Sequence, residues 1–213
     1  MATYDLDEQE RMDELKAWWK RWGSLVMFGL AVVIAVAAGW RYWQNRVVTQ
    51  SLEAAAVYEQ LTQSLQTNDT KAARDAGAML IDQYKGTAYA PRAALLLAKL
   101  NVSARDLKSA QTQLEWAVAH SKEPAVKDLA RLRLAGVQLD QKEYDAALKT
   151  LSATHSDAFD FRFHDLKGDV LLAQGKPAEA RAAYQAAFGK MAEDNPYRSI
   201  VELKLDALGG EAK

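Results

Sequence analysis

The sequence of 213 residues contains no cysteine, only four prolines and 11 glycines, and its charges nearly cancel. The absence of cysteine excludes a disulfide scaffold, a cysteine nucleophile and a thiolate metal site. With 27 Lys and Arg against 28 Asp and Glu, the chain lacks the positive excess with which nucleic-acid-binding proteins neutralise phosphates. The scarcity of proline and glycine favours long regular elements. We therefore expect no nucleic-acid partner, and one domain of ordinary size with at most an appendage.

Catalytic signatures are also lacking. There is no phosphate-binding loop, no GxGxxG or GxSxG, and no pair of histidines at the spacing of zinc proteases. His155 and His164 have acidic neighbours that would permit a metal site, and Asp165 and Asp169 lie four residues apart on one helix face. The acidic neighbours are Asp157, Asp160 and Asp165. Solvated loop residues and a polar groove wall are the simpler interpretations, so we assign no catalytic, cofactor-binding or metal-binding residue.

Apolar residues concentrate in one segment near the N-terminus. The 19 residues 22–40 carry no charge and lie between Arg21 and Arg41. As a helix they would span roughly 28 Å, close to the hydrocarbon thickness of a bilayer. Aromatic rings that prefer the membrane interface lie at both ends of this segment. They are Trp18, Trp19, Trp22, Trp40, Tyr42 and Trp43. The pattern predicts a transmembrane anchor over residues 22–43.

Two alternatives to this anchor are a buried core helix and a cleaved signal peptide. Ala35-Val36-Ala37 has the small-x-small pattern of a cleavage site. The long, acidic N-terminal region and the second aromatic cluster nevertheless favour an anchor. Small residues recur at Ala31, Ala35 and Gly39, on one helix face. This stripe either packs against another transmembrane helix or faces lipid.

The positive charges beside the span predict its orientation. Four Lys or Arg residues precede it and two follow it within a similar distance, which places the N-terminus in the cytoplasm. The residues before the span are Arg11, Lys16, Lys20 and Arg21, and those after it are Arg41 and Arg46. We expect a cytoplasmic tail over 1–21, a domain over 44–208 across the membrane and a C-terminal tail over 209–213.

From residue 51 onward the composition and periodicity are helical, with no strand-like alternation. Turn residues divide this region into nine expected helices. They are 50–67, 70–84, 88–102, 106–120, 125–139, 143–153, 159–174, 177–190 and 196–208. Short links between them suggest stacked helical hairpins.

The segment from Phe161 to Lys190 resembles a tetratricopeptide repeat. Small residues stand where paired helices cross, and Tyr184 stands at the aromatic position between neighbouring hairpins. The small residues at the crossing are Gly168, Ala180 and Ala187, and Gly175 stands at the turn between the two helices. Matching alanines of earlier units are Ala73, Ala110 and Ala147, at spacings of 37, 37 and 33. We predict an all-α, right-handed solenoid capped by the last helix; the alternative is an irregular helical domain with chance matches.

Helical-repeat arrays present a concave face, lined by the first helix of each hairpin, to peptides or proteins. The residues expected on this face are Arg92, Leu95, Lys99, Val102, Leu129, Leu132, Leu139, Arg162, Asp165, Asp169 and Leu172. An apolar strip with bases at one end and acids at the other suits an extended polypeptide. The alternative is that several of these leucines are core residues.

The whole chain resembles the YfgM family of Gram-negative bacteria, the ancillary subunit of the SecYEG translocon. The junction Gly39-Trp40-Arg41-Tyr42-Trp43-Gln44 and the segment Ala146-Ala147-Leu148-Lys149-Thr150-Leu151 are the specific parts of the resemblance. The resemblance implies an inner-membrane protein whose repeat domain lies in the periplasm. It also implies binding to SecYEG and to PpiD, a membrane-anchored chaperone of the prolyl-isomerase class, and no catalytic residues or cofactor. We therefore expect a non-enzymatic adaptor that helps to handle exported polypeptides; the alternative is an envelope scaffold unconnected with export.

Overall fold

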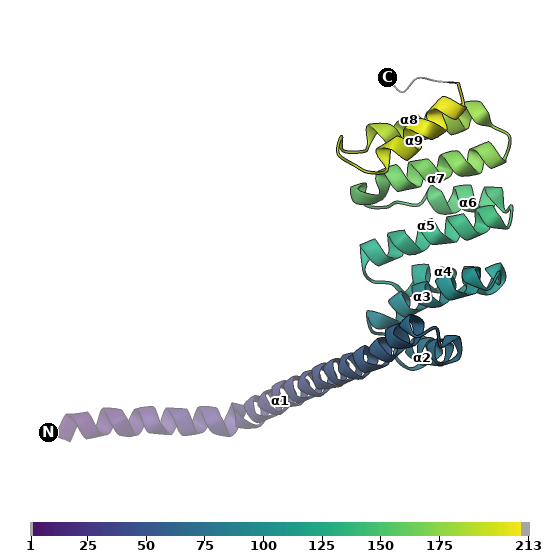
Figure 1. Ribbon diagram of the computed structural model, residues 1–213. Helices are drawn as coiled ribbons and strands as arrows, with labels where there is room; N and C mark the ends of the chain where they lie inside the picture. The colour runs from purple at the N-terminus through teal and green to yellow at the C-terminus, as the bar shows by residue number, and fades with distance from the viewer. Residues whose placement is uncertain (1, 210–213) are drawn as a thin grey trace. The chain divides into compact units, whose positions relative to one another are not determined.

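The computed structural model describes the backbone of residues 2–209 and the side chains of residues 11–209. Every regular element in that range is a helix (Figure 1), which confirms the all-α class. The chain divides into two units, Met1–Thr49 and Gln50–Lys213. Of the expected C-terminal tail, only Gly209 lies within the described residues.

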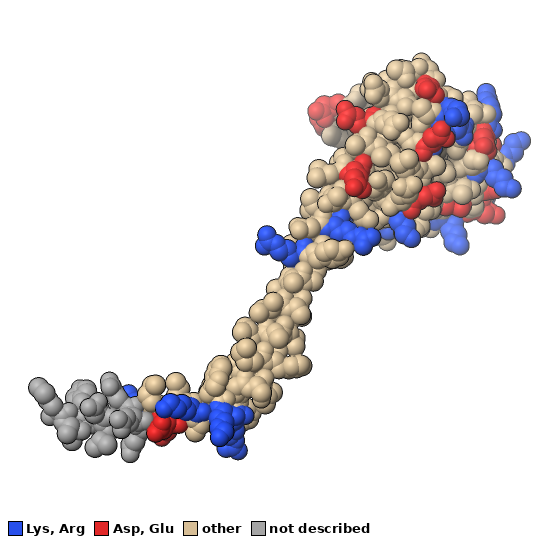
Figure 2. Space-filling model, turned by 90° about the horizontal axis from the view of Figure 1, so that it is seen from below, with Lys and Arg blue, Asp and Glu red and all other residues tan. Residues whose placement is uncertain are grey.

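The first unit consists of the greater part of helix α1 (Ala2–Gln66). Its side chains from residue 24 to residue 49 are all exposed, including Leu25 at 59% and Val33 at 64%. Figure 2 shows the uncharged stretch of this helix with Lys and Arg side chains at both of its ends. The helix is long and apolar enough to cross a membrane. A helix that is apolar on every face and exposed on every face is unlike the core helix of a soluble protein.

The second unit is a stack of helical hairpins (Figure 1). The end of α1 shares a core cluster with α2. The pairs α3 with α4, α5 with α6 and α7 with α8 follow, with α9 last. The bounds are α2 (Thr70–Gln83), α3 (Tyr89–Ser103), α4 (Leu107–His120), α5 (Pro124–Asp140), α6 (Tyr144–Leu151), η1 (Asp157–Phe159), α7 (Asp160–Ala173), α8 (Pro177–Gly189) and α9 (Arg198–Ala207). First helices of successive hairpins also touch, because α3 contacts α5 and α5 contacts α7.

Nearly all helix ends lie within two residues of the sequence prediction. The exception is the helix that was expected to begin at residue 50, which is instead the end of α1. No glycine or proline interrupts residues 40–66, so nothing in that stretch breaks the helical hydrogen-bond ladder. The first buried side chain of the second unit is Ala54.

Each hairpin turns through one residue in the left-handed backbone region. These residues are Asn68 (φ 57°), Arg105 (φ 64°), Lys142 (φ 62°) and Gly175 (φ 77°). The residue that follows the left-handed residue donates its backbone amide to the carbonyl of the residue five positions before it. Glu143 donates to Gln138 at 2.8 Å, and Lys176 donates to Leu171 at 3.0 Å. This is the Schellman geometry, which satisfies the last carbonyls of the first helix. The turns recur at 37, 37 and 33 residues, so the backbone repeats with the period predicted from the alanines.

The predicted small positions are buried where helices cross. Ala73, Ala110, Ala147 and Ala180 each have no exposed surface. Gly168 of α7 faces the ring of Tyr184 of α8, which is 1% exposed. Side chains of this size let backbones approach closely and leave room for one large partner. These contacts confirm the repeat and exclude chance matches.

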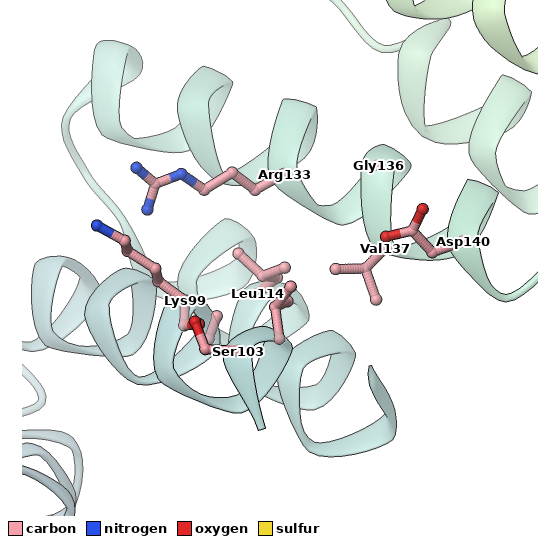
Figure 3. Close-up of a pocket in the computed structure, with 9 residues that line it drawn as sticks. Lys99, Ser103, Leu114, Arg133, Gly136, Val137 and Asp140 are labelled. Atoms are coloured by element: carbon pink, nitrogen blue, oxygen red, sulfur yellow. The ribbon is translucent and has the colours of Figure 1, made fainter. Parts of the chain in front are cut away.

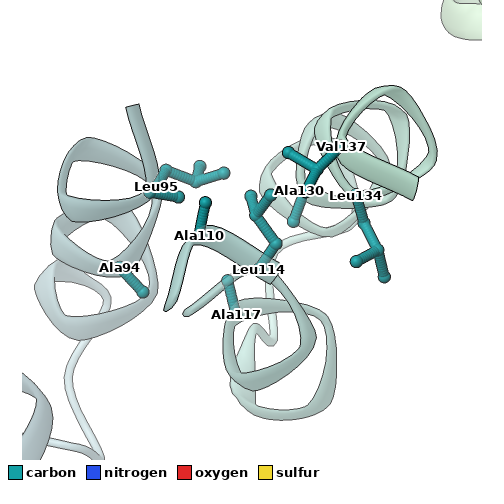
Figure 4. Packing of buried hydrophobic residues seen from close by; sticks show 9 residues of the cluster. Ala94, Leu95, Ala110, Leu114, Ala117, Ala130, Leu134 and Val137 are labelled. Carbon is teal, nitrogen blue, oxygen red and sulfur yellow. The ribbon is translucent and has the colours of Figure 1, made fainter. Parts of the chain in front are cut away.

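Among the described side chains, four core clusters run along the stack. Figure 4 shows the one formed by α3, α4 and α5, in which Leu95 and Leu114 point into the space shared by the three helices. Leu95 is 5% exposed. The prediction that Leu95 lies on the open concave face is therefore wrong. Its side chain is enclosed where α3 crosses α4, and the position of a residue in the repeat does not determine that contact.

Helix α9 covers the last hairpin, as expected of a cap. Val201 and Leu205 are buried with Tyr184 and Ala187 of α8. The guanidinium of Arg198 lies 3.7 Å from the centre of the Phe188 ring, a favourable cation–π geometry. Apolar burial on one side of α9 thus closes the end of the stack.

Candidate protein-binding groove

A pocket of about 420 Å³ lies between α3 and α5, with α4 as its floor (Figure 3). Two of the predicted face residues, Lys99 and Val102, line it from α3. The other lining residues are Ala98, Ser103, Leu114, Arg133, Gly136, Val137 and Asp140. We call this space the α3–α5 pocket. It lies between the first helices of two successive hairpins, where the repeat architecture places a ligand-binding face.

The α3–α5 pocket is apolar at its floor and charged at its ends. Leu114 and Val137 belong to the underlying core cluster. Figure 3 shows the Arg133 and Lys99 side chains at one end and Asp140 at the other. An apolar floor with charged groups at its ends provides burial for one side chain and orientation for the chain that carries it.

Arg133 is held over the pocket by a hydrogen bond that leaves most of its donors free. Its Nη1 donates to the backbone carbonyl of Leu95 at 3.3 Å. Partial burial lowers the pKa of its guanidinium, although an arginine stays charged at neutral pH. A guanidinium has five N–H donors arranged for carboxylate recognition. Arg133 can therefore bind an additional anionic group.

Other predicted face residues are occupied or partly buried. Arg92 forms an ion pair with Glu123 at 2.7 Å, which links α3 to the start of α5. Leu129 packs against the core cluster of α3, α4 and α5. Leu132 and Leu139 pack against the next cluster, around Ala135 and Phe163. Both side chains are half-buried, so they contribute mainly to the packing between hairpins and only in part to an open surface.

The predicted acidic residues of α7 are engaged by the cap helix. The Nζ of Lys204 on α9 lies 2.7 Å from Asp165 Oδ1 and 2.7 Å from Asp169 Oδ1. The hydroxyl of Tyr184 also donates to Asp169 at 2.7 Å. Burial opposes the charge of Lys204, but the two carboxylates outweigh it and raise the pKa of the ammonium. Within the described residues, this pair therefore fastens α9 to α7 and is not a free groove wall.

Two further residues of α7 remain accessible. Leu172 is 42% exposed. Arg162 lies over the rings of Phe161 and Tyr197, at 5.3 Å and 5.0 Å from their centres. Their place on a binding surface stays a prediction.

His155 and Asp160, two of the residues considered for a metal, are tied into local contacts. His155 Nε2 lies 3.1 Å from Asp160 Oδ1, and its ring stacks on Phe163 at 3.8 Å. Asp160 also pairs with Lys190 at 2.9 Å. Burial lowers the pKa of His164. In the described part of the chain, no group of three His, Asp or Glu side chains is placed to hold a metal ion.

The aromatic residues flanking the span are exposed in the first unit. Trp18 and Trp19 have ring centres 6.3 Å apart, and Trp40 and Trp43 have ring centres 5.6 Å apart. The exposed fractions range from 44% at Trp22 to 71% at Tyr42. A methyl group added at Gly39 would touch no described atom. The Ala31, Ala35 and Gly39 stripe is therefore open, and its role in helix packing stays a prediction.

The prediction from sequence missed Arg133, Gly136 and Asp140. Gly136 occupies the same place in α5 as Lys99 in α3 and Asp169 in α7, one residue after the small crossing position. That register identifies Gly136 as a face residue, but a glycine has no side chain that signals binding. Arg133 and Asp140 lie just beside the expected positions and reach the pocket because of their length.

Comparison with known proteins gives matches along nearly the whole chain. A family described as a tetratricopeptide repeat-like domain matches residues 16–210. A protein of Neisseria gonorrhoeae named ancillary SecYEG translocon subunit is 33% identical over 210 residues, covering 98% of this chain and 100% of its own. Proteins of the same name from Haemophilus influenzae and Escherichia coli are 30% and 28% identical. The first covers 87% of this chain and 90% of its own, and the second covers 98% and 99%.

Proposed function

This chain belongs to the tetratricopeptide repeat-like family of ancillary SecYEG translocon subunits, and from that premise we propose that it is a non-enzymatic adaptor anchored in the inner membrane beside the SecYEG channel. The observation that carries the proposal is the match from end to end with relatives of that name, at 98% and 100% coverage. A match of this extent includes the apolar helix as well as the repeats. It therefore concerns the whole arrangement of anchor and binding domain, and not the repeat fold alone, which occurs with many functions.

The anchor supports the proposal because it would concentrate the repeat domain near the channel. We place residues 22–43 in the membrane, residues 1–21 in the cytoplasm and the repeat domain in the periplasm, in line with the excess of Lys and Arg before the span. Tethering converts binding to a neighbour into an intramolecular event with a high effective concentration. Modest contacts made by the repeats then suffice for association.

The repeat domain would use its concave face for two kinds of protein partner. One is a membrane-anchored chaperone of the PpiD type, and the other is an unfolded polypeptide that leaves the channel. The α3–α5 pocket supports this use because it combines an apolar floor with charged ends. A non-enzymatic role fits the carboxylates of α7, which are occupied in ion pairs with Lys190 and Lys204.

Co-purification tests the proposal. The full chain, tagged after Lys213, is extracted from membranes in mild detergent, and its partners are quantified by mass spectrometry. We expect SecYEG subunits and a PpiD-like chaperone above the level obtained with an unrelated tagged single-pass protein. Recovery of neither partner contradicts the proposal. Recovery of one folded envelope complex without the translocon indicates a scaffold unconnected with export.

A further inference from the structure

Gly136 in the α3–α5 pocket has no packing reason to be glycine. Two other helical glycines do: a methyl group at Gly77 would lie 2.7 Å from Leu97, and one at Gly168 would meet the Tyr184 ring. At Gly136 a methyl group would touch no described atom. Glycine inside a helix costs about 1 kcal/mol relative to alanine. The glycine at this position keeps the pocket open at the expense of helix stability.

The two cations of the α3–α5 pocket lack the carboxylate partners that two other cations of the repeat domain have among the described residues. Arg92 is paired with Glu123, and Lys204 with two carboxylates. No carboxylate lies within 4.0 Å of the cationic nitrogens of Lys99 or Arg133 among the described residues. Asp140 lies at the other end of the pocket (Figure 3). Two unneutralised cations at one end of an apolar cavity are complementary to an anionic group carried next to an apolar one.

The spacing along α5 matches an extended peptide. Arg133 and Val137 are four residues apart on one helix, so their Cα atoms are separated by about 6 Å along its axis. The Arg133 side chain extends away from Val137 (Figure 3). In an extended chain, side chains two residues apart point to the same side at a distance of about 6.6 Å. Residues i and i+2 of one extended segment can therefore lie over Arg133 and Val137. The carboxylate side chain of the first then reaches along the Arg133 side chain to its guanidinium, and the second places an aliphatic side chain over Val137.

We propose that the α3–α5 pocket binds an extended polypeptide segment in which Asp or Glu stands two residues from Leu, Ile or Val. Arg133 and Lys99 bind the side-chain carboxylate, and the aliphatic side chain occupies the cavity beside Gly136 over Leu114 and Val137. This inference deepens the proposed function and rests on it, since it gives the sequence chemistry of the chains that the adaptor binds.

Fluorescence anisotropy with the full chain in nanodiscs tests the inference. The probe is a dye-labelled hexapeptide, Ser-Glu-Ser-Leu-Ser-Lys, with both ends blocked. We expect its affinity to exceed that of the Glu→Gln peptide by about tenfold, because hydrogen bonds to charged groups are worth that or more. The Leu→Ser peptide should also bind at least about tenfold more weakly, since one buried leucine contributes this much or more. Equal binding of all three peptides overturns the inference, as does binding only of a peptide with a free C-terminus.

Three variants locate the site. Gly136→Leu puts a side chain into the cavity at a position where a Cβ atom meets no described atom within 4 Å, and it should reduce binding of the parent peptide by about tenfold or more. In Lys99→Gln/Arg133→Gln the preference for Glu over Gln should fall to about one. Lys108→Gln, an exposed cation on α4, is the control and should bind as the native chain does. Full binding by Gly136→Leu, with a melting temperature no lower than that of the native chain, overturns the inference.

The same variants separate this inference from the proposed function. If Gly136→Leu loses the peptide but still co-purifies with SecYEG, the pocket binds chains and the anchor or another face contacts the translocon. If the native chain co-purifies with SecYEG but does not discriminate among the peptides, the proposed function stands and the inference fails.

Discussion

Gly168 and Tyr184 form a close contact that sets the crossing of the last hairpin. A methyl group at Gly168 would lie 2.5 Å from Tyr184 Cδ1. The ring cannot move away easily, because it is 1% exposed and its hydroxyl donates to Asp169 at 2.7 Å. Burial, followed by the hydrogen bond to Asp169, raises the pKa of the phenol, so Tyr184 remains a neutral donor. One glycine and one tyrosine thus fix how α7 and α8 approach each other.

Gly168→Ala should therefore destabilise the repeat domain, whereas Gly136→Ala should stabilise it. Overpacking at Gly168 costs about 1–3 kcal/mol, of which the better helix propensity of alanine returns about 1 kcal/mol. At Gly136 alanine causes no overpacking, so its better helix propensity should raise the stability by about 0.5–1 kcal/mol. Circular dichroism melts of the full chain in detergent should show opposite shifts in melting temperature. A fall in both variants would contradict the packing argument.

The left-handed turn residues predict another pair of opposite effects. Lys142 is exposed at φ 62°, so Lys142→Gly should relieve backbone strain and raise the free energy of unfolding by about 1 kcal/mol. Gly175 has φ 77°, and Gly175→Ala should lower the free energy of unfolding by a similar amount, about 1 kcal/mol. Denaturant titrations check both values. Lys108→Gly, inside α4, is the control and should destabilise by about 1 kcal/mol.

The fold could be predicted from sequence because its signals are local. Turn residues such as Asp106, whose carboxylate accepts from the Ser109 amide at 3.1 Å, begin helices where the sequence indicates. Ala110, Ala147 and Ala180 show the period and the crossing points. The start of the first repeat helix was wrong because α1 has no breaker after residue 40, and composition does not show where a membrane helix ends and a repeat helix begins.

The groove was only partly predictable because exposure depends on contacts between hairpins. Leu95 and Lys99 lie one turn apart on the same face of α3, yet Leu95 is enclosed by α4 and Lys99 is open. Asp169 occupies the register position of Lys99, but α9 supplies Lys204 to neutralise it. The angle between hairpins and the position of α9 determine which of these side chains are exposed and which are paired. The repeat pattern of the sequence predicts neither.

The bridge between Lys204 and the two carboxylates of α7 predicts a pH dependence. Lys204→Met leaves Asp165 and Asp169 without their cation and should cost about 1–3 kcal/mol at pH 7. Burial raises the pKa of Asp165 even in the native chain. An acid with a raised pKa in the folded state is stabilised by protonation, so the cost should shrink as the pH falls from 7 towards 4. Melting curves of both proteins at the two pH values measure the change.

A double variant checks the cause of that loss. Lys204→Met/Asp165→Asn removes one buried negative charge together with the cation, so it should recover part of the stability of the single variant at pH 7. It should also depend less on pH between 7 and 4. If the double variant is no more stable than the single variant, lost apolar packing of the lysine stem explains the effect instead.

The orientation of the anchor gives the last prediction. Four Lys or Arg residues precede the span and two follow it, and positive loops are retained in the cytoplasm. Alkaline phosphatase, which folds only after export, should therefore be active when fused after Lys213, and β-galactosidase should be inactive at the same position. Replacing Lys16, Lys20 and Arg21 with Gln leaves one positive residue before the span against two after it, so a fraction of the fusions should invert and lose phosphatase activity. An inactive phosphatase fusion of the native chain would place the repeat domain in the cytoplasm, where it could not receive chains leaving the channel.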